Sequence, residues 1–127
     1  MKQEFPWSLH VPGILKGDLL EKVKTAMSEF SFVDGKTTAG GAAAKVKNNL
    51  QMTESQQKQQ LDQMVLQQIM SVPDVHKAVF PAKIYNLIYA KYGIGNTYGW
   101  HIDSPIMMSQ QPIRTDVAMT IFLANPE

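Results

Sequence analysis

The strongest constraint on the fold is a change in sequence periodicity at Pro81. Before this proline, apolar residues recur at helical spacing in residues 18–30 and again in residues 53–70, with polar residues between them. After it, short runs rich in Ile, Leu, Val and Tyr are separated by turn residues, which is typical of strands. Three such strands are expected, at residues 82–92, 98–102 and 114–124. Helices followed by antiparallel strands predict an α+β fold, in the order of a helix-buttressed barrel.

The first 81 residues carry further local signals. Asp18 is placed to cap the first long helix, and Thr53 with Gln56 fits a capping box for the second. The small residues at 37–44 predict a loop, and Gly93–Asn96 predicts a turn. The remaining expectations are an irregular strand at 5–15, a strand at 45–52 and a short helix at 71–80 that Ser71 caps.

Composition excludes several classes of protein. The chain has no cysteine, which rules out disulfides, zinc–thiolate sites and iron–sulfur clusters and leaves only nitrogen and oxygen ligands for a metal. The net charge is +1 and Arg114 is the only arginine, so nucleic-acid binding has no electrostatic support. Neither a signal peptide nor a membrane span is evident, and we expect a soluble, cytoplasmic protein.

His101 and Asp103 are the residues that point to chemistry. On a strand, residues two apart project from the same face, so the imidazole and the carboxylate would lie together. Such a pair supplies two of the three ligands of a 2-His-1-carboxylate facial triad, which binds Fe(II) and leaves positions open for a co-substrate and O2. A solvated surface pair is the plainer interpretation of a His-x-Asp sequence taken alone.

The surrounding residues favour the metal site. The spacing Tyr92-x-x-Gly95-x-x-Tyr98-x-x-His101-x-Asp103 resembles the signature of the prolyl-4-hydroxylase-like Fe(II)/2-oxoglutarate dioxygenases. The chain is most similar to the PKHD-type hydroxylases within that superfamily. The matching segments are Thr38-Ala39-Gly40, Val46-Lys47-Asn48-Asn49, Arg114-Thr115-Asp116 and Phe122-Leu123.

The resemblance implies a fold and a set of cofactors. Residues 1–81 would form a support region of helices and strands, and residues 82–127 the first strands of an antiparallel double-stranded β-helix, a cupin-like jelly roll. His101 and Asp103 would be metal ligands and catalytic residues. Tyr92 and Phe122 would face the co-substrate 2-oxoglutarate. Fe(II), 2-oxoglutarate, O2 and the reductant L-ascorbate (vitamin C) are implied, with a peptidyl or free amino-acid side chain as the hydroxylated substrate.

The sequence departs from the family pattern after the motif. No histidine follows Asp103 to serve as the distal iron ligand, and Arg114 is out of place for the 2-oxoglutarate carboxylate. His10 and His76 are the remaining histidines, and we expect both to be ordinary surface or half-buried residues. The chain also ends directly after an apolar run. We therefore expect a fragment, or a chain whose partners lie elsewhere, with impaired activity.

Two alternatives stay open. The first is an Fe(II)/2-oxoglutarate-dependent hydroxylase, and the second is a non-catalytic binding or structural fragment of a degenerate jelly roll. The sequence does not decide the substrate or whether the protein forms a homo-oligomer.

Overall fold

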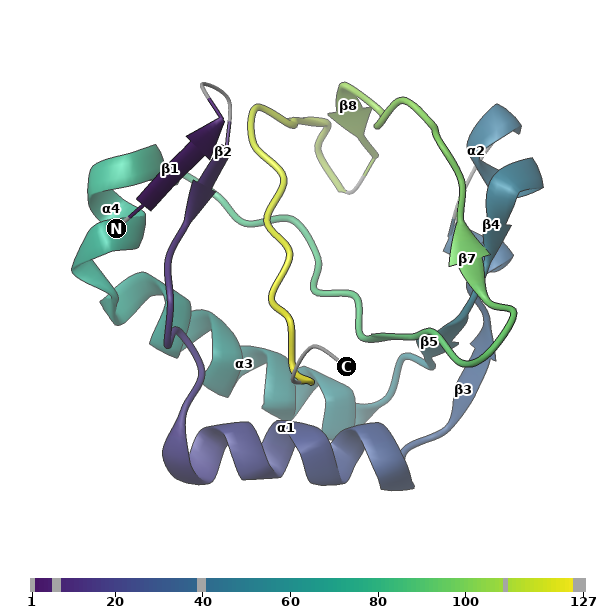
Figure 1. Cartoon of the computed structure of the whole chain (residues 1–127), viewed down its shortest axis with the longest axis horizontal. Coiled ribbons are helices and arrows are strands. Elements are labelled where there is room, and N and C mark those ends of the chain that lie inside the picture. Colours follow the sequence, from purple (N-terminus) through teal and green to yellow (C-terminus); the bar gives the residue numbers. More distant parts are fainter. Residues whose placement is uncertain (1, 6–7, 39–40, 109, 125–127) are drawn as a thin grey trace.

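The chain folds into helices and short antiparallel strands. A computed structural model describes residues 2–5, 8–38, 41–108 and 110–124 (Figure 1). The helices are α1 (Gly17–Glu29), the 3-10 helix η1 (Gly35–Thr38), α2 (Gly41–Val46), α3 (Gln56–Ser71) and α4 (Pro73–Val79). The strands are β1 (Lys2–Phe5), β2 (Ser8–His10), β3 (Phe32–Asp34), β4 (Lys47–Asn48), β5 (Leu50–Met52), β6 (Ala90–Lys91), β7 (Thr97–Tyr98), β8 (Ile106–Met107) and β9 (Ile113–Arg114). The α+β prediction is confirmed.

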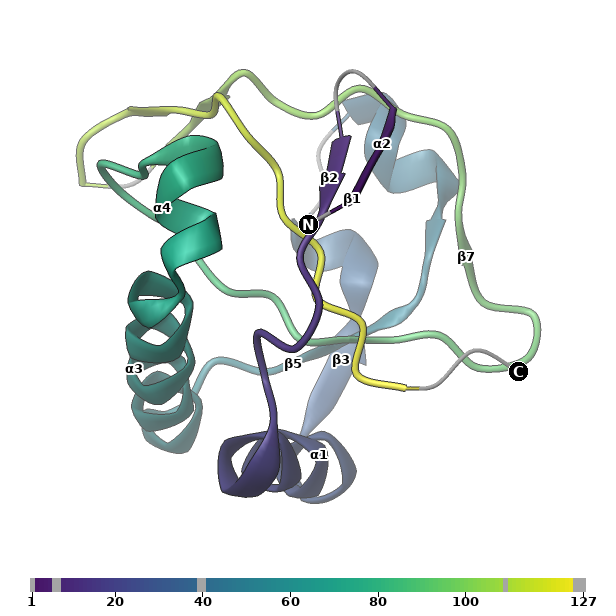
Figure 2. The same cartoon turned by 60° about the vertical axis from the view of Figure 1, so that its left-hand side comes forward.

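All strand pairs in the described residues are antiparallel. β5 lies between β3 and β6, and the pairs β1–β2, β4–β7 and β8–β9 are separate two-stranded ladders. Figures 1 and 2 place α1 and α3 together on one side of the molecule, with α4 at the end of α3. The extended segments before β6 and after β9 run across the other side of these helices.

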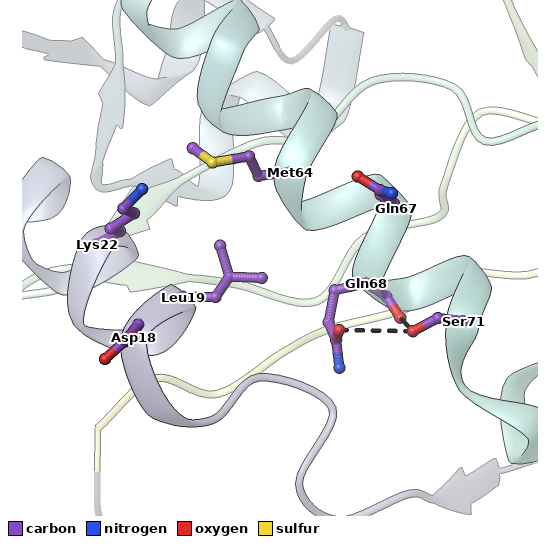
Figure 3. Close-up of a pocket in the computed structure, with 7 residues that line it drawn as sticks. All are labelled: Asp18, Leu19, Lys22, Met64, Gln67, Gln68 and Ser71. Atoms are coloured by element: carbon purple, nitrogen blue, oxygen red, sulfur yellow. Dashed lines mark hydrogen bonds between the residues drawn. The ribbon is translucent and has the colours of Figure 1, made fainter.

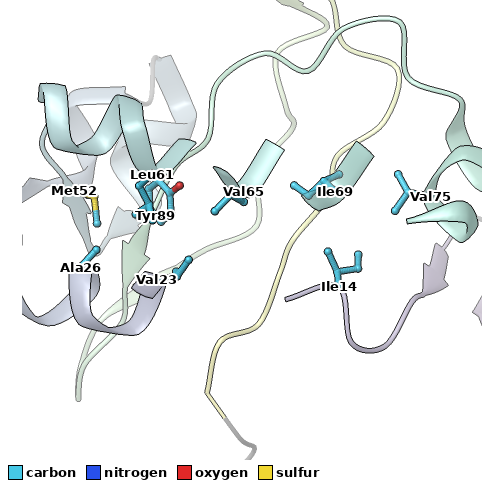
Figure 4. Close-up of a cluster of buried hydrophobic side chains, with 9 residues drawn as sticks. All are labelled: Ile14, Val23, Ala26, Met52, Leu61, Val65, Ile69, Val75 and Tyr89. Carbon is cyan, nitrogen blue, oxygen red and sulfur yellow. The ribbon is translucent and has the colours of Figure 1, made fainter. Parts of the chain in front are cut away.

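The core lies where α1 and α3 meet these extended segments. Leu61, Val65 and Ile69 recur along one face of α3 and are almost fully buried, as the periodicity of the sequence predicts. Figure 4 shows this row of α3 side chains facing Val23 of α1 and, at one end, Tyr89 of the segment before β6. The remaining members of the buried cluster are Ile14, Ala26, Met52 and Val75. Burial of this face holds helices and strands together, because removing apolar surface from water is the main favourable term in folding.

A buried ammonium group joins α3 to the same segment. Lys58 is 1% exposed, and its Nζ lies 2.9 Å from Asp62 Oδ2 and 3.1 Å from Glu54 Oε1. The same Nζ lies 5.5 Å from the centre of the Tyr89 ring, within cation–π range. Burial raises the pKa of the Tyr89 phenol, and the Asp62 carboxylate raises it further. Lys58 is tolerated in the core because its charge is compensated on two sides.

The helix starts differ from the predictions. α3 begins after Ser55, whose hydroxyl accepts a hydrogen bond from the backbone N–H of Lys58 at 3.0 Å, so the proposed Thr53 cap was wrong. Lys16, not Asp18, precedes α1, and Val72, not Ser71, precedes α4. The loop expected at 37–44 contains the end of η1 and most of α2. Its alanines have high intrinsic helix propensity, which prevails over the flexibility of the neighbouring glycines.

The long strands expected after Pro81 are paired only in part. In the segment 82–92 only Ala90–Lys91 forms a strand, and the strands that reach into 98–102 and 114–124 are the short β7 and β9. Single backbone hydrogen bonds at Tyr89, Gly99 and Thr115 extend this pairing by one residue each. The loop expected at 104–113 instead contains β8 and the start of β9. A strand is stabilised by hydrogen bonds to its neighbours, and these segments have few neighbours within the described residues. None of the described helices is both long and apolar enough to cross a lipid bilayer.

Replacing Lys58 by alanine should lower the free energy of unfolding by about 3 kcal/mol, because the mostly buried Asp62 carboxylate would lose its partner. Urea unfolding followed by circular dichroism measures this loss. The matched control is Lys77→Ala on the exposed face of α4, which should change stability by less than about 0.5 kcal/mol. Equal stabilities for the two variants would contradict a structural role for Lys58.

Candidate functional site

His101 and Asp103 lie in contact just after β7. Residues 100–104 form no strand, so the two side chains are not aligned by a sheet as expected. His101 Nε2 nevertheless lies 3.2 Å from Asp103 Oδ1. The imidazole is 24% exposed and the carboxylate 73% exposed. The pair is therefore open to solvent on the carboxylate side.

The backbone defines which imidazole nitrogen faces the carboxylate. His101 Nδ1 lies 2.8 Å from the carbonyl oxygen of Gly99. A carbonyl oxygen only accepts hydrogen bonds, so Nδ1 carries the proton and, in the neutral ring, Nε2 presents a lone pair. A lone pair and a carboxylate oxygen then face each other, an arrangement that either a proton or a metal ion between them would stabilise.

The spacing of the two atoms fits a metal ion. Ligands at right angles on an ion, each bonded at about 2.1 Å, lie about 3 Å apart, which matches the separation of His101 Nε2 and Asp103 Oδ1. A third ligand is not in place: in the part of the chain that the structure describes, no three His, Asp or Glu side chains gather closely enough to hold a metal. The donors present fit part of a facial triad.

The other predicted contacts are more dispersed. Tyr92 is 52% exposed and lies near enough to Tyr98 to influence its ionisation. Phe122 is 86% exposed, and Figures 1 and 2 show its segment, residues 117–124, running apart from β7. Arg114 donates two hydrogen bonds to the Asp116 carboxylate at 2.7 and 3.3 Å, so its guanidinium is already engaged. Ala39 and Gly40 of the Thr-Ala-Gly segment lie outside the described residues.

The neighbours of His101 were not assigned roles from the sequence. The Tyr98 ring stacks on the imidazole with centroids 3.7 Å apart and planes 9° apart. Lys47 Nζ lies 5.1 Å from the centre of the Tyr98 ring. Burial raises the pKa of the Tyr98 phenol, and the negative charge of Asp103 raises it further. Tyr98 belongs to the spacing that ends at Asp103, and Lys47 belongs to the separate Val46-Lys47-Asn48-Asn49 segment of the resemblance. The sequence did not indicate that these two residues meet.

Glycine at position 99 allows β7 to approach β4. The Gly99 N–H donates to the Val46 carbonyl at 2.9 Å, which extends the β4–β7 ladder by one bond. A Cβ atom at Gly99 would lie only 2.9 Å from the Val46 Cβ. A side chain at position 99 would therefore displace the backbone that carries His101.

The grooves in the surface lie elsewhere. One lies between α1 and α3 and is lined by both polar and apolar side chains (Figure 3). Its lining residues are Asp18, Leu19, Lys22, Met64, Gln67, Gln68 and Ser71. None of them belongs to the predicted site, and this groove has no cluster of metal-binding side chains.

Comparison with known proteins adds independent information. The chain is 38% identical over 117 residues to a PKHD-type hydroxylase of Gloeothece citriformis, covering 92% of this chain and 53% of that protein. It is 33% identical over 123 residues to a PKHD-type hydroxylase of Beijerinckia indica, covering 94% and 54%. A PKHD-type hydroxylase of Picosynechococcus is 37% identical over 117 residues, covering 91% and 52%. The chain thus spans about half the length of these relatives. No family model and no solved structure matches it.

Replacing Gly99 by alanine should destabilise the protein by about 1–3 kcal/mol, because the new methyl group overlaps Val46. Gly93→Ala is the matched control, since a Cβ there would meet its nearest atom, Asn96 Oδ1, at an ordinary 3.5 Å. Thermal unfolding of both variants checks the difference. A Gly99→Ala variant as stable as Gly93→Ala would argue against close packing of β4 and β7.

Tyr98 should ionise at higher pH than a free phenol, whose pKa is 10.0. Subtracting the alkaline near-ultraviolet titration of Tyr98→Phe from that of the wild type isolates this group. Because the pKa is raised on folding, the phenol stabilises the folded state below about pH 10, and this contribution is lost as the pH rises through the folded pKa. A midpoint for Tyr98 at or below that of free tyrosine would contradict the packing against His101 and Asp103.

Proposed function

This chain is a relative of the PKHD-type hydroxylases along 92% of its length, and we propose on that premise that it supplies part of an Fe(II)- and 2-oxoglutarate-dependent hydroxylase. The observation that carries the proposal is the contact of His101 Nε2 with Asp103 Oδ1 at 3.2 Å, a spacing suited to two ligands of one ion. His101 and Asp103 would then be its metal ligands and catalytic residues.

Each ligand has a defined task in this proposal. The Gly99 carbonyl holds the proton on His101 Nδ1, which leaves Nε2 to donate its lone pair to the iron. Asp103 supplies a hard anionic oxygen that neutralises part of the charge of the ion. When bound, Fe(II) with 2-oxoglutarate and O2 couples decarboxylation of the 2-oxo acid to hydroxylation of a C–H bond. L-Ascorbate would keep the iron reduced, and the substrate would be a peptidyl or amino-acid side chain.

The distribution of apolar side chains supports a jelly roll as the complete fold. In the segment before β6, Leu87 and Tyr89 pack against the helices, while Ile88 and Tyr92 stay about half exposed. After β9, Ile121 and Leu123 pack against the core, and Phe122 is exposed. A layer with helices on one face and apolar side chains on the other is suited to covering by a second sheet. Tyr92 and Phe122 would line the interior formed in this way.

A non-catalytic role is the second candidate function. It is favoured by the incomplete donor set and by the engaged guanidinium of Arg114, because two ligands without a carboxylate clamp would bind iron and 2-oxoglutarate weakly. In that case the contact between His101 and Asp103 would be a hydrogen-bonded ion pair. The two functions differ in whether the pair binds a metal ion.

Anaerobic calorimetry with Fe(II) distinguishes the two functions. We expect weak binding by the wild type and a loss of at least about tenfold in affinity for His101→Ala and for Asp103→Ala, since each removes a direct ligand. His10→Ala is the matched control, because His10 is an exposed histidine on β2. It should bind as the wild type does.

Turnover provides the functional measurement on the same proteins. Release of succinate from 2-oxoglutarate, with Fe(II) and ascorbate present, should be slow in the wild type and absent in His101→Ala. Iron affinity equal in the wild type and both ligand variants would reject the metal site. Iron binding without any succinate would favour the non-catalytic role.

A further inference from the structure

The Tyr98 ring packs face to face on the His101 imidazole. The two rings lie nearly parallel, 9° apart, at a centroid separation of 3.7 Å. The stack covers a ring face and accounts for the low exposure of the imidazole, 24%, beside a carboxylate that is 73% exposed. Aromatic packing of this kind restricts rotation of the imidazole about its side-chain bonds.

Tyr98 is itself held by the neighbouring strand. β4 and β7 pair antiparallel, with Lys47 opposite Tyr98 and Asn48 opposite Thr97. The Lys47 ammonium lies over the Tyr98 ring at 5.1 Å from its centre, and the Lys47 residue is 6% exposed. The position of Tyr98 therefore depends on the register of this short ladder.

Asn48 stabilises the turn that precedes β7. Its Nδ2 donates to the Gly95 carbonyl at 3.3 Å, and its Oδ1 accepts from Asn96 Nδ2 at 3.4 Å. Asn96 Oδ1 in turn accepts from the Gly93 N–H at 2.9 Å. Gly95 adopts a positive φ of 82°, which closes the turn. These contacts fix where β7 begins, and hence where Tyr98 points.

We propose that Tyr98 is a positioning residue that holds the His101 imidazole with Nδ1 towards the Gly99 carbonyl and Nε2 towards Asp103, and that Asn48 secures Tyr98 through the turn. The effect on metal binding rests on the proposed function. The orientation of the imidazole does not, because it is a property of the metal-free protein. Tyr98 acts through His101 and needs no contact with the metal.

The hydroxyl group is not needed for this role. The stack uses the faces of the two rings, and no hydrogen bond involving the Tyr98 hydroxyl contributes to it in the described residues. Phenylalanine at position 98 should therefore preserve the orientation of His101. Leucine should lose it, because an aliphatic side chain has no flat face to stack.

NMR of the metal-free protein tests the orientation. In the wild type we expect the His101 ring protons to be shifted upfield by the Tyr98 ring, and the ring nitrogens to report a proton on Nδ1. Tyr98→Phe should keep both features, and Tyr98→Leu should lose the upfield shift and mix the tautomers. Tyr85→Leu is the matched control and should leave His101 unchanged, because the Tyr85 hydroxyl bonds to the Met108 carbonyl at 3.2 Å.

Titration with Co(II) tests the consequence for metal binding. Paramagnetic broadening of the His101 signals should need about two- to tenfold more Co(II) in Tyr98→Leu, the range that a stacked aromatic pair supports, and no more in Tyr98→Phe. Asn48→Ala is a second variant for the case in which Tyr98→Leu does not fold. It removes an exposed side chain and should leave the protein folded. It should change the tautomer and the Co(II) requirement in the same direction by a smaller amount.

The outcomes separate this inference from the proposed function. A His101 shift and tautomer unchanged in both Tyr98→Leu and Asn48→Ala would overturn the positioning role. An unperturbed Co(II) response, with the orientation lost, would overturn the effect of this orientation on metal binding. Absence of any Co(II) response in the wild type would reject the metal site alone, since the metal-free spectra still report on Tyr98.

Discussion

The apolar face of α3 is the contact on which the rest of the structure depends. Leu61, Val65 and Ile69 meet α1 on one side and the segment before β6 on the other, so helices and extended segments share one core. The Met52 N–H donates to the Tyr89 carbonyl at 2.9 Å, which joins β5 to that segment beside the core. β5 continues β4 after one residue, and β4 pairs with β7. The site is thus connected to the core through the backbone.

Charge is handled differently in the core and at the site. In the core, Lys58 is enclosed and its two carboxylate partners neutralise it, which is a structural use of a buried ion pair. At the site, the Asp103 carboxylate stays open to solvent and touches a single imidazole nitrogen. An open carboxylate beside a fixed lone pair retains the capacity to bind a cation. The carboxylates around Lys58 lack this capacity, because the ammonium group already neutralises them. This contrast separates the structural cluster around Lys58 from the candidate site.

Local patterns predicted some features well. The turn at Gly93–Asn96 forms, with the Asn96 N–H bonded to the Gly93 carbonyl at 3.0 Å, because its residues favour a turn wherever they occur. The residue predicted to cap α3 was wrong, because Thr53 and Ser55 are both good capping residues and the sequence alone does not choose between them. The Thr53 N–H donates to the Ser31 carbonyl of the chain before β3, which keeps Thr53 outside the helix and leaves Ser55 to cap it. A distant contact decided between two local candidates.

The sequence by itself determined the α+β class and the buried face of α3, because periodicity and residue type act over a few neighbouring residues. Its resemblance to PKHD-type hydroxylases pointed to His101 and Asp103 as the candidate site. Only the tertiary structure decided that Tyr98 stacks on His101, that Asn48 holds the preceding turn and that the strands after Pro81 pair only briefly. Asn48 lies 47 residues before Gly95, and Tyr98, only three residues before His101, is paired with Lys47 of a distant strand. Contacts of this kind and the number of neighbouring strands depend on the fold, and no local pattern carries that information.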